Sequence, residues 1–576
     1  MPRAGNAGYG KPPVTPGHPM QKRQHIILAG GFLALCAAAL LLAGRHLETP
    51  GVFYDEVIQA EPAVQFLRAD GRPSEIPGIK SARLWGRWFP VMTQPYMGAL
   101  KSQALIPTFA LFGATPSSLR LTTLAWGLAG LLLAMLWARR TLGLATALLA
   151  GSFVVLDPSF LLVSRHDWGS VALAFVCRCG GLYFAYSGWS ARRGGQLFIA
   201  GLLLGLGLYN KIDFGIFLGA AGVALLVTAP AAVRAALRSP RAILGVLGFG
   251  LGAAPMGPVL GEAVRASRTV LVRRGGAATD WSEKLHTLQA VFDGSYFHRL
   301  MLAGGSFEEM FDVQGAAAGP FLAIFVACVL FVAARLWAGR RRTDGDDTAA
   351  RAQTFVLVTT LLSVMGFLLM PAAERIHHVM NAWPFPQLMV AIAVVELWQA
   401  GAAHARRRVV LRSAAIGIAG AVLAGSLVVS LHTLETMRET GGKGRWSDAL
   451  GRFAEEAAAR PDALVISLDW GLDGPLRFTA PDLQLVEPIW KLQRSGKRGE
   501  GWTHEGEPDH VYLLYVDEYA LFDFGASLLE AVRSLPPGSA TIRTHLDRSG
   551  DPAFLSVRIA QPHRLVYRRG FEVRLR

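Results

Sequence analysis

The stretch IILAGGFLALCAAALLLAG, residues 26–44, contains no charged residue and follows a short basic segment. An α-helix needs about 20 predominantly apolar residues to cross roughly 30 Å of hydrocarbon. The stretch is longer than the apolar core of a secretory signal peptide, which has about 7 to 15 residues. Similar runs recur along the chain, so the first one is predicted to be a retained membrane anchor.

The composition indicates the same class for the whole chain. Of its 576 residues, 52% are hydrophobic and only 17% are charged, whereas a soluble domain carries about 25% charged residues. We therefore expect a polytopic α-helical membrane protein with about eleven spans. The expected spans are residues 26–44, 118–138, 143–163, 169–188, 196–209, 212–229, 242–260, 319–337, 353–370, 379–400 and 411–431.

The chain has a net charge of +15, which is also common in nucleic-acid-binding proteins. Its basic residues, however, collect in short segments between alternate apolar runs. These segments are residues 21–24, 138–140, 191–195, 234–241, 335–342 and 404–412. This is the positive-inside pattern of membrane proteins. It predicts that the N-terminus and these loops are cytoplasmic, that the chain is a multi-pass protein of the cell (inner) membrane, and that nucleic acid is not a partner.

For every basic segment to stay inside, YMGALKSQALIPTFALFG (96–113) must not cross the membrane. It carries Lys101, Ser102 and Gln103 in its middle, which favours a helix lying in the interface. A twelfth span is the alternative.

The composition changes again near Thr433, where the apolar runs end. Helical periodicity and strand-like runs then alternate. Helices are expected at 446–459 and 524–535, and strands at 463–470, 510–518 and 553–560. We thus expect three parts: a disordered cytoplasmic N-terminus (1–25), a transmembrane domain (26–432) and an extracytoplasmic α/β domain (433–576).

The first outer loop contains two adjacent carboxylates, Asp55 and Glu56, shortly after the first span. They begin an amphipathic segment, so a helix-capping role is one interpretation, because anions are favoured at a helix N-terminus. A carboxylate partly removed from water also suits a general base that acts on an alcohol. The pair is therefore predicted to be catalytic, at the mouth of a membrane-embedded active site.

A second polar cluster, SRHDWG, lies at the outer corner between two spans. It supplies Arg165, His166 and Asp167. A structural Arg–Asp pair is one interpretation. The other is a site in which Arg165 binds a phosphate, while His166 and Asp167 contact the substrate or a metal.

Two further outer corners supply Lys211 and the ERIHH segment with Arg375, His377 and His378. Lysine and arginine at the depth of lipid headgroups can bind a phosphate diester, so Lys211 and Arg375 are predicted to bind one. Adjacent histidines point to different faces of a helix, so at most one of them, His378, is expected to bind a substrate or a divalent metal. Interfacial histidines without a ligand are the alternative.

These motifs carry a resemblance to a known family. FYDE, the interfacial segment YMGALKSQALIPTFALFG, the span SSLRLTTLAWGLAGLLLAMLWARRTLG and the corner SRHDWG resemble the GT-C membrane glycosyltransferases. The likeness covers roughly residues 26–400. The nearest group is the bacterial relatives of protein O-mannosyltransferases and of the lipid A aminoarabinose transferase.

The resemblance implies a sugar transfer on the outer face of the membrane. The donor would be a hexose or pentose on a polyprenyl phosphate, and the acceptor a hydroxyl of a lipid, a glycan or a protein. In such enzymes the acid of the first loop is the catalytic base, which maps onto Asp55, with Glu56 beside it. The acid of a later loop maps onto Asp167, and the basic residues that hold the lipid phosphate map onto Lys211 and Arg375.

Two other classes remain open from the sequence. A transporter or lipid flippase predicts polar residues through the bilayer midplane and broken helices, and a non-catalytic sensor or assembly protein would use the C-terminal domain for binding. Apart from Arg178 within a span, and Asp157 beside Pro158, the ionisable residues collect at one face. This one-sided distribution favours an enzyme.

Overall fold

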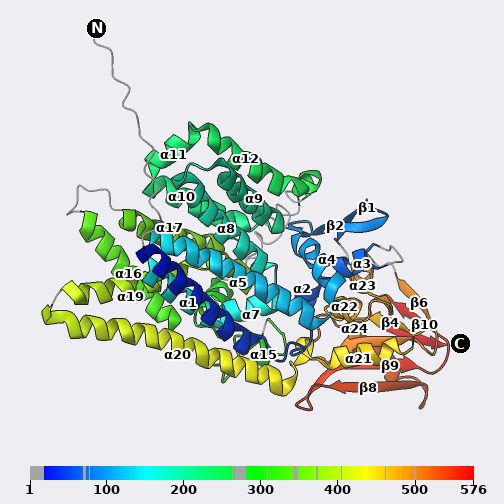
Figure 1. Cartoon of the computed structure of the whole chain (residues 1–576). Coiled ribbons are helices and arrows are strands. Elements are labelled where there is room, and N and C mark those ends of the chain that lie inside the picture. The colour runs from blue at the N-terminus through cyan, green and yellow to red at the C-terminus, as the bar shows by residue number, and fades with distance from the viewer. Residues whose placement is uncertain are drawn as a thin grey trace, which may run out of the picture.

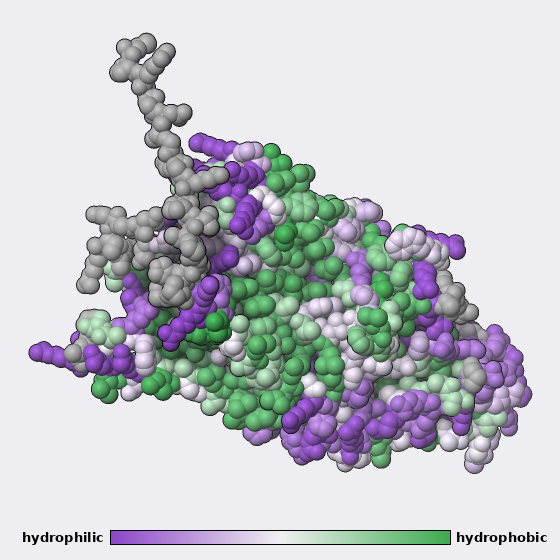
Figure 2. Space-filling model, in the orientation of Figure 1, coloured by the Kyte–Doolittle hydropathy of each residue, from purple (hydrophilic) through white to green (hydrophobic). Residues whose placement is uncertain are grey.

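The structure, a computed structural model, describes residues 19–576 except 69–72, 75, 77, 263–264, 266–280, 308, 341–347, 371–373, 404, 461 and 499–500. A bundle of helices forms one part and a region rich in strands forms the other (Figure 1). Hydrophobic residues cover much of the helical part, and hydrophilic residues gather over the C-terminal region (Figure 2). The expected combination of a membrane bundle and an α/β domain is confirmed.

The bundle contains most of the apolar runs of the sequence. Its helices are α1 (Pro19–Ala43), α5 (Pro116–Thr141), α6 (Leu144–Leu156), α7 (Pro158–His166), α8 (Val171–Ser190), α9 (Gly194–Asn210), α10 (Phe214–Thr228), α11 (Pro230–Leu237), α12 (Pro240–Ala253), α16 (Phe321–Arg340), α17 (Thr348–Leu369), α19 (Phe385–Ala403) and α20 (Arg408–Thr440). Short 3₁₀ turns accompany them, namely η1 (Ala254–Val259), η2 (Met380–Ala382), η3 (Ala405–Arg407) and η4 (Gly444–Trp446).

The number of spans differs from the expected one. Each expected span overlaps a helix, but only 8 helices of the described residues are long and apolar enough to cross a membrane. The pairs α6–α7 and α10–α11 are bent by 64° and 108°, which gives up to 10 spans if each pair counts as one. The helix α9 is apolar but short. The expected count of about eleven is therefore not confirmed.

Two of the expected domain boundaries fall inside helices. The helix α1 already begins at Pro19, within the segment 1–25 that we expected to be disordered; residues 1–18 lie outside the described residues. The helix α20 continues to Thr440, past the boundary expected at 432. In both places the helix continues into polar sequence that hydropathy alone assigns to the neighbouring part.

Small residues allow α9 and α12 to approach each other closely. A Cβ atom built on Gly201 of α9 would lie 1.9 Å from the carbonyl oxygen of Gly245, and one on Gly248 of α12 would lie 2.1 Å from that of Phe198. Glycine stripes of this kind let membrane helices pack backbone against backbone. They fix α12 against α9, whose C-terminal end carries Lys211.

Asp157 and Arg178 stabilise the breaks between helices. Asp157 caps α7 by accepting a hydrogen bond from the Phe160 N–H at 3.0 Å, and it also accepts one from the Gln387 amide at 2.6 Å. Arg178 donates to the carbonyl oxygens of Met380 (2.9 Å) and Trp383. For Arg178 the sequence left open an ion pair or a cavity role, and its observed hydrogen bonds are to backbone oxygens.

The first outer loop folds into a small unit that the sequence did not predict in full. It contains α2 (Tyr54–Val57), α3 (Glu61–Leu67), β1 (Lys80–Leu84), β2 (Arg87–Gln94), β3 (Met97–Gly98) and α4 (Leu100–Phe112), with the three strands in the order β1-β2-β3. The helix α4 packs against α3 and is absent from the candidate spans of the described chain. This is the arrangement expected of an interfacial segment at 96–113.

The second outer loop and the segment before α19 contribute short helices. These are α14 (Trp281–Phe292), α15 (Tyr296–Leu302) and α18 (Ile376–Val379). The helices α14 and α18 contact each other, and α15 packs against α20. Segments far apart in sequence thus meet beside the bundle.

The C-terminal region is an α/β unit. Its elements are α21 (Ala449–Ala458), β4 (Leu464–Ser467), α22 (Asp473–Thr479), β5 (Gln484–Val486), α23 (Ile489–Arg498), β6 (Trp502–Gly506), β7 (Val511–Tyr515), α24 (Phe524–Arg533), β8 (Ala540–Leu546), β9 (Pro552–Ile559), β10 (His563–Tyr567) and β11 (Phe571–Leu575). A five-stranded sheet has the order β5-β4-β7-β9-β8, and a three-stranded sheet the order β11-β10-β6. The three strands and two helices expected from the sequence are all present.

The two faces of the five-stranded sheet pack against different helices. Val465 and Leu513 belong to the core beneath α21 and α22, whereas Ile466 and Leu514 belong to the core beneath α23 and α24. This alternation follows the two-residue period of a strand. The helix α22 also contacts α2 of the first outer loop, so the C-terminal unit rests on the element that carries Asp55.

Candidate active site

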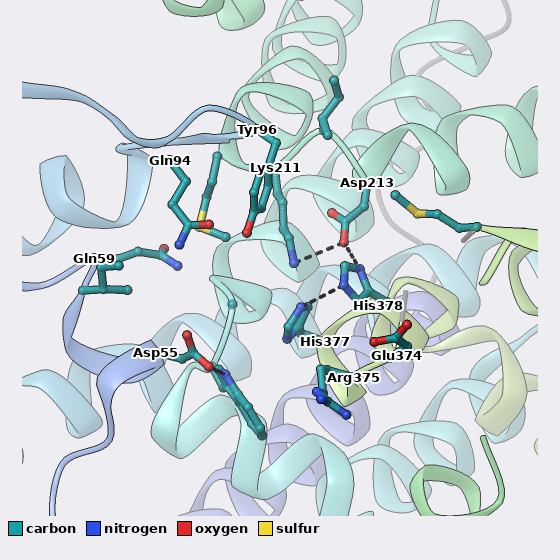
Figure 3. A pocket seen from close by; sticks show the side chains of 16 residues that line it. Asp55, Gln59, Gln94, Tyr96, Lys211, Asp213, Glu374, Arg375, His377 and His378 are labelled. Atoms are coloured by element: carbon teal, nitrogen blue, oxygen red, sulfur yellow. Dashed lines mark hydrogen bonds and ion pairs between the residues drawn. The ribbon is translucent and has the colours of Figure 1, made fainter. Parts of the chain in front are cut away.

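A cavity of about 420 Å³ lies where the first outer loop, the α7–α8 corner and the segments before α10 and α18 meet. Trp168 and Gly169 line it from the α7–α8 corner, and ten polar side chains line it from the other segments (Figure 3). They are Asp55, Gln59, Gln94, Tyr96, Lys211, Asp213, Glu374, Arg375, His377 and His378. The cavity is therefore assembled by the fold from short pieces of distant sequence.

Asp55 occupies the first turn of α2, and its side chain reaches the cavity (Figure 3). The indole N–H of Trp168 donates a hydrogen bond to Asp55 Oδ2. Burial raises the pKa of Asp55, although Trp168, Lys211 and Arg375 partly offset this effect because each favours the carboxylate. A carboxylate with raised proton affinity beside a cavity has the chemistry of a general base.

Glu56 lies next to Asp55 in sequence but does not line the cavity. Its carboxylate accepts hydrogen bonds from Arg120 Nε at 2.7 Å and Nη2 at 2.9 Å. Arg120 also donates to the carbonyl oxygens of Leu47, Pro50 and Gly51. Both side chains are almost completely buried, so this pair fixes the backbone that leads into α2.

The α7–α8 corner has an unusual backbone. Asp167 has φ = 43° and Ser170 has φ = 59°, and the left-handed region costs about 1–2 kcal/mol for a residue with a side chain. Asp167 offsets this cost because its Oδ1 accepts from the Ala172 N–H at 2.8 Å and its Oδ2 lies 3.2 Å from Lys101 Nζ. The corner thereby turns Trp168 toward Asp55.

Gly169 completes this corner for a steric reason. Its φ is +77°, and a Cβ atom there would lie 2.8 Å from the Cβ of His377. Any side chain at this position would therefore push α18 away from the corner. The lack of a side chain lets His377 line the same cavity as Trp168.

Lys211 follows α9 and points into the cavity (Figure 3). Its Nζ lies 3.3 Å from Asp213 Oδ2, and the same oxygen lies 2.8 Å from His378 Nδ1. Burial opposes ionisation of Asp213, but Lys211 and His378 outweigh it and lower its pKa to about 2. The site thus holds a lysine next to an aspartate whose ionised form Lys211 and His378 favour.

Arg375 lies on the opposite side of the cavity, just before α18. Its Nη1 lies 2.7 Å from Glu283 Oε1 of α14, and its guanidinium carbon lies 4.1 Å from the centre of the Phe307 ring. These contacts hold the guanidinium in place while its remaining N–H groups can serve a ligand. The helix α14 thus helps to position Arg375 through Glu283.

The two histidines do not diverge as we expected. The ring centroids of His377 and His378 are 4.2 Å apart, and their Nε2 atoms are 3.1 Å apart. The helix α18 is only one turn long and continues as the 3₁₀ turn η2, so helical spacing does not separate the rings. Within the described residues, no group of three or more His, Cys, Asp or Glu side chains is arranged to hold a metal ion.

The structure brings together Asp55, Lys211, Arg375 and His378 of the eight predicted site residues. The other four, Glu56, Arg165, His166 and Asp167, do not line the cavity. They lie in the packing behind it. The predicted phosphate ligand Arg165 instead donates to the carbonyl oxygens of His46 and Thr49, both at 2.6 Å.

The ring of His166 is fully buried. Its Nδ1 lies 3.8 Å from Glu56 Oε1. Because the ring has no exposed surface, it cannot contact a substrate in the cavity. Asp167 is fully buried too and pairs with Lys101. Both residues therefore stand behind the cavity wall, because the left-handed corner turns Trp168 and Gly169 toward the cavity in their place.

Several lining residues were not predicted. Gln94 ends β2 and Tyr96 lies in the turn between β2 and β3, and this small sheet has no clear signal in the sequence. Trp168 lies in the corner SRHDWG. Because a buried indole N–H needs a hydrogen-bond acceptor, this residue could have been predicted to contact a polar group of the site. Gln59 follows α2 and had no such signal.

Comparisons with known proteins agree on the fold. Residues 103–257 match the model of the dolichyl-phosphate-mannose-protein mannosyltransferase family. The structure of ArnT from Cupriavidus metallidurans bound to undecaprenyl phosphate superimposes with a TM-score of 0.52 at 15% identity, over 92% of this chain and 98% of that chain. The chain has the GT-C glycosyltransferase fold.

A second solved structure is more distant. The oligosaccharyltransferase of Archaeoglobus fulgidus, in complex with Zn and sulfate, gives a TM-score of 0.42 at 13% identity, over 80% of this chain and 62% of that chain. No curated protein sequence matches the chain. The family match and the GT-C fold confirm the resemblance that the sequence motifs indicate.

Proposed function

We propose that this GT-C protein transfers a sugar from a polyprenyl-phosphate donor to an acceptor hydroxyl on the outer face of the membrane. One observation carries the proposal: Asp55 shares a single cavity with Lys211 and Arg375, which come from three distant segments. A base and two cations around one space are what a glycosyl phosphate and an alcohol require. The ArnT structure of the same fold was solved with undecaprenyl phosphate, which supports this class of donor.

In the proposed reaction the acceptor oxygen attacks the anomeric carbon of the sugar. Asp55 takes the proton of the attacking hydroxyl, the new C–O bond forms, and the bond between the anomeric carbon and the phosphate oxygen breaks. The electron pair leaves with the polyprenyl phosphate. Attack opposite the leaving group inverts the anomeric carbon.

Lys211 and Arg375 stabilise the charge that develops on the leaving phosphate. Such stabilisation is stronger in a water-poor site than in bulk solvent, and Lys211 is buried. Asp213 and Glu283 hold the two cations in place through their ion pairs. Glu56 and Asp167 act as positioning residues, because each holds the backbone that presents a lining residue.

A donor-binding test addresses the phosphate role. We expect Lys211→Gln to raise the KM for a labelled polyprenyl-phosphate sugar by about 10- to 100-fold, because a charge-assisted hydrogen bond contributes about 1.5–3 kcal/mol. Lys211→Arg keeps the charge and restores part of the affinity. Transfer would be measured with the full chain in proteoliposomes.

Lys80→Gln is the matched control, because Lys80 forms an exposed pair with Glu262 outside the cavity. It is expected to leave the KM unchanged. If Lys211→Gln binds donor as the native chain does, the assignment of the phosphate site is wrong.

The pH profile tests the base role independently. Asp55 acts as a base only when it is ionised, and burial raises its pKa. We therefore expect kcat/KM to fall as the pH drops through the pKa of Asp55, which lies above the ordinary aspartate pKa of about 3.9. Trp168→Phe removes a donor that favours the carboxylate, so the pKa of Asp55 rises and this acid limb moves to higher pH. A limb that stays in place, or moves to lower pH, contradicts the role of Asp55.

A further inference from the structure

A second cavity lies in the C-terminal domain, between α21 and the five-stranded sheet. Its volume is about 440 Å³, comparable to that of the candidate active site, and the two cavities share no lining residue. Val465 of β4 and Val511 of β7 contribute apolar lining. The helix α21 and the strands β8 and β9 lie beside one another at this edge of the domain (Figure 1).

The strand register brings arginines to this cavity. In the antiparallel pair β8–β9, Thr541 lies opposite Arg558 and Arg543 lies opposite Ser556. Alternate residues of a strand face the same side, so Arg543 and Arg558 both project from the face that α21 covers. Arg460, just beyond α21, lines the cavity from the helix side. Three guanidinium groups therefore surround one space.

The charges in this cavity are not balanced. Glu456 of α21 engages Arg543, with Nη1–Oε2 and Nη2–Oε1 distances of 2.6 and 3.2 Å. In the part of the chain that the structure describes, no carboxylate lies within ion-pair distance of Arg460 or Arg558. Burial and repulsion from Arg460 and Arg543 lower the pKa of Arg558, against the opposing effects of Asp509 and Glu456.

Neutral polar groups lie beside these cations. His545 Nε2 lies 2.9 Å from Ser556 Oγ, and both side chains are buried and line the cavity. The His545 ring stacks on Phe554 with a centroid distance of 4.4 Å. Burial, with Arg543 nearby, lowers the pKa of His545 to about 4. At neutral pH it adds hydrogen-bonding capacity without adding charge.

We propose that this cavity binds a phosphate ester, with the phosphate held between Arg460 and Arg558. Guanidinium groups bind phosphate oxygens through paired, charge-assisted hydrogen bonds. Two cations without carboxylate partners match the charge of a phosphate monoester, which is about −1.5 to −2 at neutral pH. The cavity volume leaves room for the organic part of the ligand beside Val465 and Val511.

The same phosphate chemistry can come from a soluble ester or from a lipid headgroup. The site is independent of the proposed transferase chemistry, because none of its residues lines the cavity around Asp55. If the protein does not transfer a sugar, the proposed phosphate site can still be correct. If this cavity does not bind phosphate, the proposed transferase activity can still be correct.

Binding would be measured by calorimetry and thermal unfolding of the full chain in detergent, at constant ionic strength, with glycerol 3-phosphate as the soluble probe. Micelles that contain phosphatidic acid or phosphatidylcholine form the lipid arm. We expect the affinity for the phosphate probe to fall about tenfold or more in Arg558→Gln, and further in Arg460→Gln/Arg558→Gln. Arg533→Gln, an exposed arginine of α24 outside the cavity, is the matched control.

The binding results distinguish a phosphate site in this cavity from its absence. Binding of either probe that the double variant loses and the control keeps supports the proposal, and the probe that binds identifies the source of the phosphate. An equal unfolding temperature of the double variant and the control without ligand shows that the fold is intact. The proposal is overturned if neither probe binds, or if the double variant and Arg533→Gln respond equally.

Discussion

Asp55→Asn is expected to lower kcat for sugar transfer by about 10²- to 10⁴-fold, the range that a positioned general base contributes. Asparagine has the shape of aspartate and can still accept the hydrogen bond from Trp168. It cannot take the proton of the acceptor hydroxyl. The KM for the donor is expected to stay near that of the native chain, because Lys211 and Arg375 are unchanged. Turnover of a labelled lipid-linked sugar by the purified chain provides the measurement.

The control for this experiment is Asp482→Asn. The side chain of Asp482 is 87% exposed and pairs with Arg68 on the surface, outside the cavity. This variant is expected to have native kinetics. Native turnover of Asp55→Asn would remove the base from the mechanism, and a loss confined to KM would move Asp55 to a binding role.

The membrane part could be predicted from the sequence because its signal is local. A long apolar run such as residues 26–44 is a helix in any context that lacks water. The strands β4 and β7 were equally clear, because Val465 and Leu513 lie in short apolar runs bounded by polar turns. The number of spans was not predicted, because hydropathy alone does not show that the apolar run 144–166 is bent by 64° where Asp157 caps α7 and Pro158 begins it.

The site could be predicted only to the level of segments. Acids and bases at the outer ends of spans pointed to Asp55, Lys211 and Arg375, and these three residues do share a cavity. The sequence could not decide which of two adjacent acids faces that cavity. The choice depends on Arg120, 64 residues further along the chain, which binds Glu56 and leaves Asp55 to the cavity.

A similar long-range effect governs the corner SRHDWG. From the sequence, any of its polar residues could enter the site. Lys101 binds both the carboxylate and the carbonyl oxygen of Asp167, which buries Asp167 and fixes the left-handed turn. Trp168 is then the residue that reaches Asp55. The sequence shows Lys101 in an otherwise apolar segment, but it does not show the partner of this lysine.

Arg120→Met is expected to destabilise the protein by about 3–5 kcal/mol, the cost of removing one partner of a buried ion pair. The Glu56 carboxylate then remains buried without its partner, and the carbonyl oxygens of Leu47 and Pro50 lose their donor. Thermal unfolding of the purified chain in detergent provides the measurement. Arg335→Met is the matched control, because Arg335 pairs with Glu396 where half of its side chain is exposed, and exposed pairs contribute about 0–1 kcal/mol.

A double variant separates the charge from the packing. In Glu56→Leu/Arg120→Met no charge is left unpaired, so its unfolding temperature is expected to exceed that of Arg120→Met. If the pair also positions Asp55, the double variant folds but keeps a reduced kcat with an altered acid limb, because the turn into α2 has lost its anchor. Native kcat and an unmoved acid limb in a folded double variant would restrict the pair to stability. An Arg120→Met variant as stable as Arg335→Met would show that the buried pair does not hold this loop at all.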